Sequence, residues 1–377
     1  MNQNKMRCYA SCSFGLEAVV ARELKELGME NVVSRDARVY FDADAQQLAA
    51  ANLWLSAADR VYIVLGEFQA HTFDELFEGV RAIPWQQYLP KDASFPVSGD
   101  AVRAELMSVS DIQSIAKKAI VERMKAEYGL SFFKESGWEY PVYINNLANQ
   151  VTVSLNSSGV GLNRRGYRTR NSKAPIRETL AAGIIRLSRW YDRPFYDIMC
   201  GSGTIAIEAA LKAQQRAPGL YRTFTAEKWS DTFAEAFAQQ RERARDLFVK
   251  HPDIQIFASD IDPEMVELTS FHAKKAGVED IIEISRQDAT KFVPATTCGT
   301  LISNPPYAMR LGEKEEVARL YRDLGRASQA WSDFRYYFIC ADEEFSKLFG
   351  KKEDKRRKLY NGNIRCYLYQ YFRKKED

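Results

Sequence analysis

Four consecutive residues, Asn304, Pro305, Pro306 and Tyr307, combine groups that can hold a flat amine. The prolines fix the backbone conformation. Because proline has no N–H group, this stretch of backbone offers hydrogen-bond acceptors but no donors. An amino group on a nucleobase needs two aligned acceptors if its nitrogen is to face an electrophile. The predicted acceptors are the Asn304 side-chain oxygen and the Pro305 carbonyl, while Tyr307 offers a ring for base stacking. Alone, the tetrapeptide could equally be a surface turn or a proline-rich ligand.

A glycine turn provides a second candidate site. The sequence DIMCGSGT places Gly201 and Gly203 between a predicted strand and a predicted helix. Ligands bind at such places in open α/β sheets, because strand ends meet helix N-termini there. Missing Cβ atoms allow close approach, and the helix N-terminus attracts a carboxylate or phosphate. Together with Ala206, the two glycines also fit a dinucleotide fingerprint, so a nicotinamide oxidoreductase is an alternative.

Aspartates at successive predicted strand ends help to decide whether the ligand is a dinucleotide or another nucleoside derivative. Asp197 lies within the strand before the turn, where it suits the cationic amino group of a methionine better than a pyrophosphate. Asp260 follows the next strand roughly 60 residues later, whereas a dinucleotide site expects an acidic residue after about 20. The spacing favours S-adenosylmethionine (SAM), with Asp260 on the ribose and Asp288 near the adenine. Each aspartate taken singly could equally be a cap or a surface residue.

A basic strip precedes the glycine turn. It contains Arg164, Arg165, Arg168, Arg170, Lys173 and Arg177 around Tyr167. Clustered cations with an aromatic residue are typical of phosphate-binding surfaces. We predict an RNA contact here, and a solvated interdomain linker is the alternative.

The elements that must position these groups alternate between strand and helix after residue 163. Strands are predicted at 195–199, 254–259, 281–285, 301–303 and 336–340, with helices at 204–213, 263–276 and 315–331. This alternation predicts a largely parallel sheet with helices on both faces, and 214–252 is taken as a long insertion. The Asn361-Gly362 pair, between 358–360 and 364–371, predicts an antiparallel hairpin that closes the sheet. The charge run 351–358 is predicted to be a solvated loop.

The part before residue 163 has a different pattern. Strands are predicted at 6–10, 39–41, 58–68, 140–145 and 150–156, with helices at 16–27, 44–55, 72–82 and 111–128. The stretch 84–96 is rich in breakers of regular structure. A compact α+β unit is therefore expected here.

Composition helps to exclude some classes of protein, such as metal-binding, secreted and membrane proteins. Among 377 residues, 53 basic and 50 acidic side chains nearly cancel, so charge alone does not identify a partner. Six scattered cysteines without a CxxC pair predict reduced thiols, and three histidines outside any ligand motif give no reason to expect a metal. The N-terminus lacks the pattern of a signal peptide, and no apolar run is long enough to cross a bilayer. We therefore expect a cytoplasmic protein without a membrane partner.

The motifs DIMCGSGT, SDID, RQDA and SNPPY resemble those of class I SAM-dependent amino-methyltransferases. The basic strip, LNRRGYRTRNSKAPIRETLAAGII, resembles the segment before the catalytic domain in bacterial THUMP-domain 23S rRNA guanine-N2-methyltransferases, including uncharacterised Gram-positive members. This resemblance implies an α/β, Rossmann-like methyltransferase domain with a C-terminal antiparallel hairpin, preceded by α+β ferredoxin-like and THUMP domains. The implied divisions are 1–43 for the ferredoxin-like part, 44–162 for THUMP, and 163–377 for the methyltransferase, with 163–177 as a basic linker.

The same resemblance assigns roles to individual residues. The implied SAM contacts are Asp197, Cys200, Gly201, Ser202, Gly203, Asp260, Ile261, Asp288 and Ala289. Asn304, Pro305, Pro306 and Tyr307 would surround the amine, and 173–179 would lie beside the SAM pocket. The implied RNA contacts are Arg164, Arg165, Arg168, Arg170 and Lys173. One departure is AMRLGEKEE after Tyr307, where relatives often carry a GERLG-like stretch.

The resulting expectation is methyl transfer from SAM to N2 of a guanine in 23S rRNA or its precursor particle. Transfer to adenine N6 in DNA or RNA, or to guanine N2 in tRNA, remains an alternative, because the tetrapeptide suits either amine. A non-catalytic RNA-binding or ribosome-assembly protein with an inactive SAM fold is an alternative of another class. The sequence leaves open the nucleotide and the oligomeric state.

Overall fold

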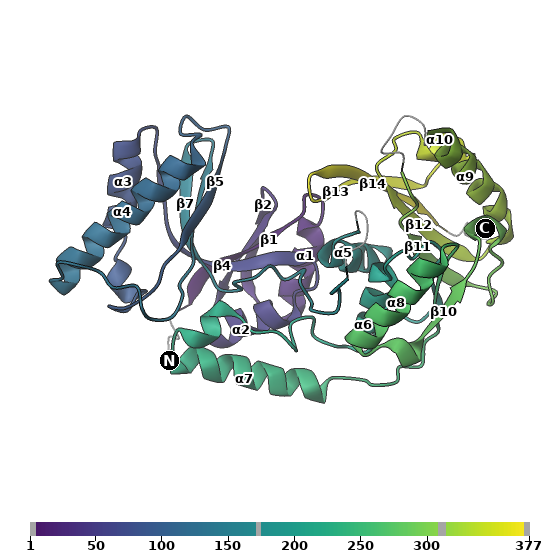
Figure 1. Cartoon of the computed structure of the whole chain (residues 1–377), viewed down its shortest axis with the longest axis horizontal. Helices are drawn as coiled ribbons and strands as arrows, with labels where there is room; N and C mark the ends of the chain where they lie inside the picture. The colour runs from purple at the N-terminus through teal and green to yellow at the C-terminus, as the bar shows by residue number, and fades with distance from the viewer. Residues whose placement is uncertain (1–4, 171–174, 308–313, 373–377) are drawn as a thin grey trace.

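The first sheet has seven strands in the order β2-β3-β1-β4-β7-β6-β5 (Figure 1). The computed structural model describes residues 5–170, 175–307 and 314–372. The strands are β1 (Met6–Cys12), β2 (Glu30–Arg35), β3 (Arg38–Ala43), β4 (Ala58–Gln69), β5 (Val97–Val102), β6 (Val142–Leu147) and β7 (Gln150–Asn156). The helices here are α1 (Glu17–Glu26), α2 (Ala45–Trp54), α3 (Phe73–Ala82) and α4 (Val109–Tyr128), with a 3-10 turn at Trp85–Gln87.

Strand β4 connects the two halves of this sheet. It pairs with β1 from Ala58 to Ile63 and with β7 from Tyr62 to Gln69, antiparallel in both cases. The two ladders overlap at Tyr62 and Ile63, so hydrogen bonding continues from one half to the other. The ferredoxin-like and THUMP parts therefore share one sheet.

Helix boundaries in this region follow from local capping. The Asp44 side chain accepts from the Gln47 backbone at the start of α2, and Thr72 does the same for Glu75 at the start of α3. Both pairs form capping boxes, which satisfy backbone N–H groups that a helix start leaves free. Helix α4 ends at Tyr128 and is followed by the cap residue Gly129, whose φ of 63° lies in the left-handed region that glycine adopts without strain.

The second sheet has the order β10-β9-β8-β11-β12-β14-β13. Its first five strands are parallel, and β14 runs antiparallel to β12 and β13. The strands are β8 (Phe195–Asp197), β9 (Ile256–Asp260), β10 (Ile282–Arg286), β11 (Gly299–Ser303), β12 (Phe334–Cys340), β13 (Lys355–Asn361) and β14 (Ile364–Tyr371). The helices are α5 (Glu178–Ser188), α6 (Thr204–Ala213), α7 (Asp231–Asp246), α8 (Pro263–Ala276), α9 (Lys314–Ala327) and α10 (Phe345–Phe349). This is the Rossmann-like sheet with a C-terminal hairpin that the sequence predicts.

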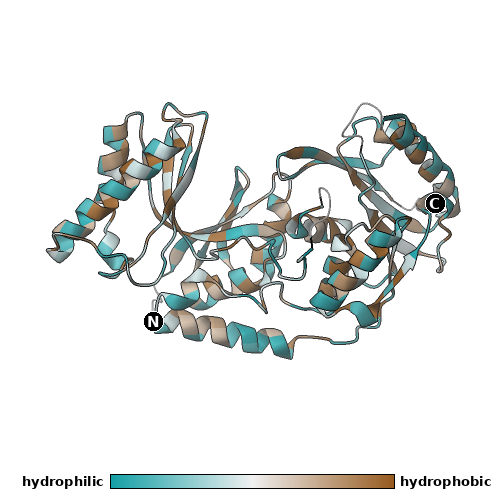
Figure 2. Ribbon diagram, in the orientation of Figure 1, coloured by the Kyte–Doolittle hydropathy of each residue, from teal (hydrophilic) through white to brown (hydrophobic). Residues whose placement is uncertain are grey.

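Helix α7 lies within the predicted insertion, and it packs against α2 of the first unit (Figure 1). The side chains of Gln46 and Gln239 form a hydrogen bond of 2.7 Å between the two helices. Figure 2 shows hydrophilic residues over the C-terminal half of α7, most of which are exposed. The insertion therefore contributes to the contact between the two units.

Two expectations for the C-terminal hairpin need correction. The run 351–358 is not all loop, because residues from Lys355 onward belong to β13. Lysine and arginine are common on such edge strands, where charge discourages pairing with other chains. The two loop residues are Gly362 and Asn363, since Asn361 still pairs with Ile364. Asn361 is therefore a strand residue rather than a turn residue.

Candidate cofactor and amine site

Two adjoining cavities lie at the carboxyl ends of the parallel strands. The larger cavity has a volume of about 420 Å³, and its walls include Pro175, Ile176, Asp197, Cys200, Gly201, Ser202, Asp262, Met265 and Asn304. The smaller cavity has a volume of about 290 Å³, with walls that include Asp260, Ile261, Asp288, Ala289, Asn304 and Pro306. Both are lined by Met199, Gly201 and Asn304. Most of the predicted cofactor residues thus line two cavities that meet beside Asn304.

Asp197 is buried at the end of β8 and has one carboxylate oxygen to spare. Its Oδ1 accepts a hydrogen bond of 2.5 Å from Ser303 Oγ. Its Oδ2 has no hydrogen-bond partner within the described residues, although the residue lines the larger cavity. Burial raises the pKa of Asp197 to about 7. An unpaired buried carboxylate beside a cavity is suited to a cationic amino group.

Ser303 is a positioning residue that the motif analysis did not single out. It ends β11, and its Oγ accepts hydrogen bonds from the backbone N–H groups of Ile198 at 2.8 Å and Met199 at 3.2 Å. One hydroxyl thus joins the end of β11 to the segment after β8 and orients Asp197. Its place directly before Asn304 was the only available sequence signal.

The glycine turn is held by groups from β9 and α8. Gly201 N donates to Asp260 Oδ2 at 2.9 Å, and Thr269 Oγ1 donates to Gly201 O at 2.8 Å. Gly203 has a φ of 83°, and a Cβ there would lie 2.8 Å from Thr269 Cγ2. Gly203 therefore serves the close packing of the turn against α8, and it does not appear among the residues that line either cavity.

Asp260 and Asp288 each combine a structural bond with a place on the smaller cavity. Asp260 Oδ1 accepts from Asp262 N at 3.1 Å, in addition to the bond from Gly201. Asp288 Oδ1 accepts from Thr290 N at 2.9 Å and from its hydroxyl at 2.7 Å, and these bonds lower the pKa of Asp288. Capping and ligand contact are compatible here, because a carboxylate has several acceptor positions.

The Asn-Pro-Pro-Tyr segment follows β11 and is fixed from α9. Tyr321 Oη donates to Pro306 O at 2.8 Å. Pro305 is buried, while Asn304 is partly exposed between the cavities. Tyr307 packs against a buried aromatic cluster, and burial raises its pKa. The departures after Tyr307, at 308 and 309, lie outside the described residues.

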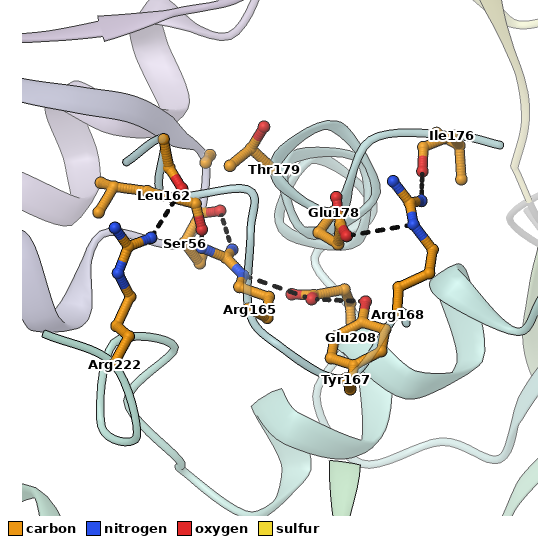
Figure 3. A network of polar contacts seen from close by, with 12 residues as sticks. Ser56, Leu162, Arg165, Tyr167, Arg168, Ile176, Glu178, Thr179, Glu208 and Arg222 are labelled. Atoms are coloured by element: carbon orange, nitrogen blue, oxygen red, sulfur yellow. Dashed lines mark hydrogen bonds and ion pairs between the residues drawn. The ribbon is translucent and has the colours of Figure 1, made fainter. Parts of the chain in front are cut away.

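The basic strip is not a uniformly exposed surface, because Arg165 and Arg168 turn inward to pair with carboxylates. The Arg165 side chain is 3% exposed and forms an ion pair of 3.4 Å with Glu208, which also accepts from Tyr167 Oη at 3.0 Å (Figure 3). Arg168 pairs with Glu178 at 3.4 Å and is 20% exposed. Buried carboxylates attract these guanidinium groups inward, a pairing that spacing alone does not reveal.

Other cations of the strip remain accessible. Arg164, Arg170 and Arg177 are exposed, and the Arg170 guanidinium lies 3.9 Å from the centroid of the Phe271 ring. Lys173 lies outside the described residues. The accessible part of the strip is therefore smaller than the sequence suggested.

Metal and membrane features can be assessed for the described part of the chain. Within it, no cluster of three or more histidine, cysteine, aspartate or glutamate side chains could hold a metal ion. None of its helices is both long and apolar enough to cross a membrane.

Three family models match successive parts of the chain. The RlmL ferredoxin-like domain matches residues 7–62, the THUMP domain matches 70–156, and the RMKL-like methyltransferase domain matches 165–370.

Curated relatives and solved structures match most of the chain. "Putative RNA methyltransferase YpsC" of Bacillus subtilis is 42% identical, covering 98% of this chain and 97% of the relative. Ribosomal RNA large subunit methyltransferase K/L of Psychromonas ingrahamii is 33% identical over 95% of this chain, which spans only 49% of that longer protein. The crystal structure of SMU.472 in complex with SAH is 37% identical, covers 100% of both chains and gives a TM-score of 0.93.

Proposed function

Because this chain belongs to the RMKL-like methyltransferase family, we propose that it methylates N2 of a guanine in 23S rRNA or its precursor particle. The cofactor is SAM, whose demethylated product SAH occupies the related SMU.472 structure. The observation that carries the proposal is the position of Asn304, which lines both cavities where they meet. An amine held by Asn304 would therefore lie beside the cofactor.

The residues that would hold SAM fit its chemistry. The unpaired Oδ2 of buried Asp197 suits the amino group of the methionine portion. Asp260, Ile261, Asp288 and Ala289 line the smaller cavity and offer carboxylates and apolar surface to a ribose and an adenine. When bound, SAM supplies a methyl group on a positively charged sulfonium, which is electrophilic enough that no strong general base is needed.

The chain's contribution to transfer is then mainly positioning. Asn304 Oδ1 and the Pro305 carbonyl would accept hydrogen bonds from the two N–H groups of the target amine and so direct its nitrogen toward the methyl donor. After transfer, with SAH as the leaving group, the amine would lose one proton to solvent. Tyr321 fixes this segment through its bond to Pro306 O. Well-oriented reactants can supply several kcal/mol of the barrier, so geometry alone accounts for a large rate effect. A base within a duplex must first be extruded to reach such a site.

RNA binding is assigned to the units outside the catalytic sheet. We propose the division 1–43, 44–162 and 163–377, with the ferredoxin-like and THUMP parts holding structured RNA. Arg164 and Arg170 are exposed candidates of the basic strip for contact with phosphate, and Arg177 is exposed as well. The longer K/L relatives act on ribosomal RNA by name, which supports this substrate over DNA.

The deciding experiment incubates the purified protein with methyl-labelled SAM and RNA from cells that lack the gene. Parallel reactions contain 23S rRNA, precursor particles or tRNA, and the product is digested to nucleosides for mass spectrometry. We expect labelled N2-methylguanosine in the 23S rRNA or precursor reaction. Label in N6-methyladenosine, or in tRNA only, would overturn the proposed target. SAH binding without transfer to any RNA would support a non-catalytic role.

A further inference from the structure

A short segment, residues 175–177, covers one side of the larger cavity, and we call it the roof segment. Pro175 and Ile176 line that cavity, and Ile176 is buried. Helix α5 begins at the next residue, Glu178. Three of the segment's backbone groups are held by side chains from other parts of the chain.

The first holding residue is Asn361, on the C-terminal hairpin. Its Oδ1 accepts from Arg177 N at 3.1 Å, and its Nδ2 donates to Pro175 O at 3.3 Å. Both ends of one side-chain amide are thus used on the roof segment, more than 180 residues away in the sequence. Asn361 pairs with Ile364 within the hairpin, so the loop itself does not require this side chain.

The hairpin that carries Asn361 is itself fixed against the first unit. Arg357 donates to the carbonyl of Gly15 at 2.9 Å, and the rings of Phe14 and Tyr360 meet edge to face at 6.1 Å. The position of Asn361 is therefore set by the packing of two units.

The second holding residue is Arg168, from the basic strip. Its guanidinium donates to the Ile176 carbonyl at 3.0 Å and pairs with Glu178 at 3.4 Å, so it lies between the roof segment and the start of α5 (Figure 3). The Glu178 side chain is 4% exposed. A bond to a charged guanidinium in such a setting is stronger than a neutral one.

We propose that Asn361 and Arg168 are positioning residues that hold the roof segment against the larger cavity and thereby set the affinity for SAM. A segment that is already ordered does not have to be immobilised when the cofactor binds, which improves affinity. Without these hydrogen bonds, the roof segment would lose conformational entropy when SAM binds, and the affinity for SAM would be lower. The transfer step is affected little, because Asn304 and Pro305 lie on a different segment, after β11. The inference rests on the cofactor and not on the proposed RNA target.

Asn361→Ala gives the sharpest test, with Asn363→Ala as its matched control. Asn363 is an exposed asparagine in the loop, two residues further on. Titration calorimetry with SAH, in the absence of RNA, should show about tenfold weaker binding for Asn361→Ala and no change for Asn363→Ala, as expected for the loss of two modest hydrogen bonds. In turnover assays, KM for SAM should rise by a similar factor while kcat stays within about twofold.

Arg168→Ala should weaken SAH binding at least as much, about tenfold, with Arg243→Ala, at an exposed arginine of α7, as control. Arg168→Lys should recover part of the affinity, because the ammonium can still meet Glu178. If Arg168→Ala fails to fold, Asn361→Ala remains a full test, since it removes no buried charge. Unchanged SAH affinity in a folded Asn361→Ala variant, or a fall in kcat with KM for SAM unchanged, would overturn the proposal. A wrong RNA target leaves these binding results untouched.

Discussion

A substitution at Asn304 should affect methyl transfer much more than cofactor binding. It lines both cavities, whereas the charged groups that we propose for the cofactor belong to Asp197 and Asp260. Asn304→Ala should lower kcat by about 100-fold or more, because the amine loses one of its two acceptors and its orientation. SAH affinity, measured by calorimetry, should change by less than about threefold, since one neutral side chain is lost. Turnover close to that of the unchanged protein would rule out the amine-holding role.

Asp197 should make cofactor binding depend on pH. Its raised pKa, about 7, means that the ligand-free carboxyl is largely protonated at pH 6 and must lose that proton to meet a cationic amine. SAH affinity should therefore rise between about pH 6 and 7.5, by up to tenfold per unit at the lower end. Asp197→Asn should bind weakly and show a flat profile over this range. A wild-type profile that falls with rising pH would contradict the assignment.

The raised pKa of Asp197 also makes the stability of the ligand-free fold depend on pH. Stability should fall as the pH rises, whereas SAH affinity should increase. A carboxyl with a raised folded pKa favours the fold most fully below its ordinary value of 3.8, and this contribution is lost as the pH rises through about 7. Ligand-free protein should therefore lose stability over this interval relative to Asp197→Asn, as measured by urea unfolding at several pH values.

At the scale of single residues, the sequence predicted many of the residues that line the two cavities but not the residues that orient them. Asp197 and Asp260 end strands and Gly201 follows one, at recognisable spacings, and the structure brings them to neighbouring cavities. Tyr321 and Thr269 lie on helices, at positions where the sequence predicts no more than burial in the hydrophobic core. Their hydroxyl bonds depend on how those helices pack, which has no short-range sequence signal.

At the scale of elements, the turn between β8 and α6 makes different demands on its two glycines. Gly203 has a positive φ and no room for a Cβ beside Thr269, whereas Gly201 has a φ of 52° and no atom within 4 Å of a Cβ position. Gly203→Ala should cost about 2–4 kcal/mol of folding free energy, from strain and overpacking together. Gly201→Ala should cost about 1–2 kcal/mol, from strain alone.

Urea unfolding of the ligand-free variants measures this difference. Gly201 lines both cavities, so Gly201→Ala should weaken SAH binding even though its fold is the more stable of the two. Equal destabilisation by the two substitutions would show that Thr269 moves aside.

The elements that the sequence analysis missed share a physical cause. Strand β2 has mostly exposed residues, and β5 contains glycine and aspartate, so neither shows alternating hydrophobicity. Helix α5 is almost wholly buried and therefore lacks a polar face to reveal a helical period. Helix α7 was hidden in a segment interpreted as an insertion. Periodicity identifies an element only when one of its sides faces water and the opposite side is buried.

At the scale of the whole molecule, the buried pair of Arg165 and Glu208 joins the linker to the catalytic domain. Arg165 also donates to the carbonyls of Leu162 and Ser56, each at 2.6 Å, and so reaches the first unit. Arg165→Ala should cost about 3–5 kcal/mol, because it leaves Glu208 buried without its partner.

Chemical unfolding measures this cost, with the exposed Arg164→Ala as a control that should change stability by less than about 0.5 kcal/mol. The double variant Arg165→Ala with Glu208→Gln should lose less than the sum of the single variants, since the uncompensated charge is removed. Additive losses would indicate that the two side chains act independently.

The pairing of strand β4 has a consequence for which nucleotide of a bound RNA could reach the proposed active site. Because β4 pairs with β1 on one side and β7 on the other, the two halves of the first sheet cannot swing apart without breaking ladder hydrogen bonds. The first sheet is also tied to the catalytic unit, through Arg165 and Ser56 and through the packing of α2 on α7. An RNA held by that sheet would therefore present to Asn304 nucleotides at a set distance from the point of attachment. Selection would then depend on the length and bend of the RNA stem between anchor and target, and neighbouring bases could vary freely.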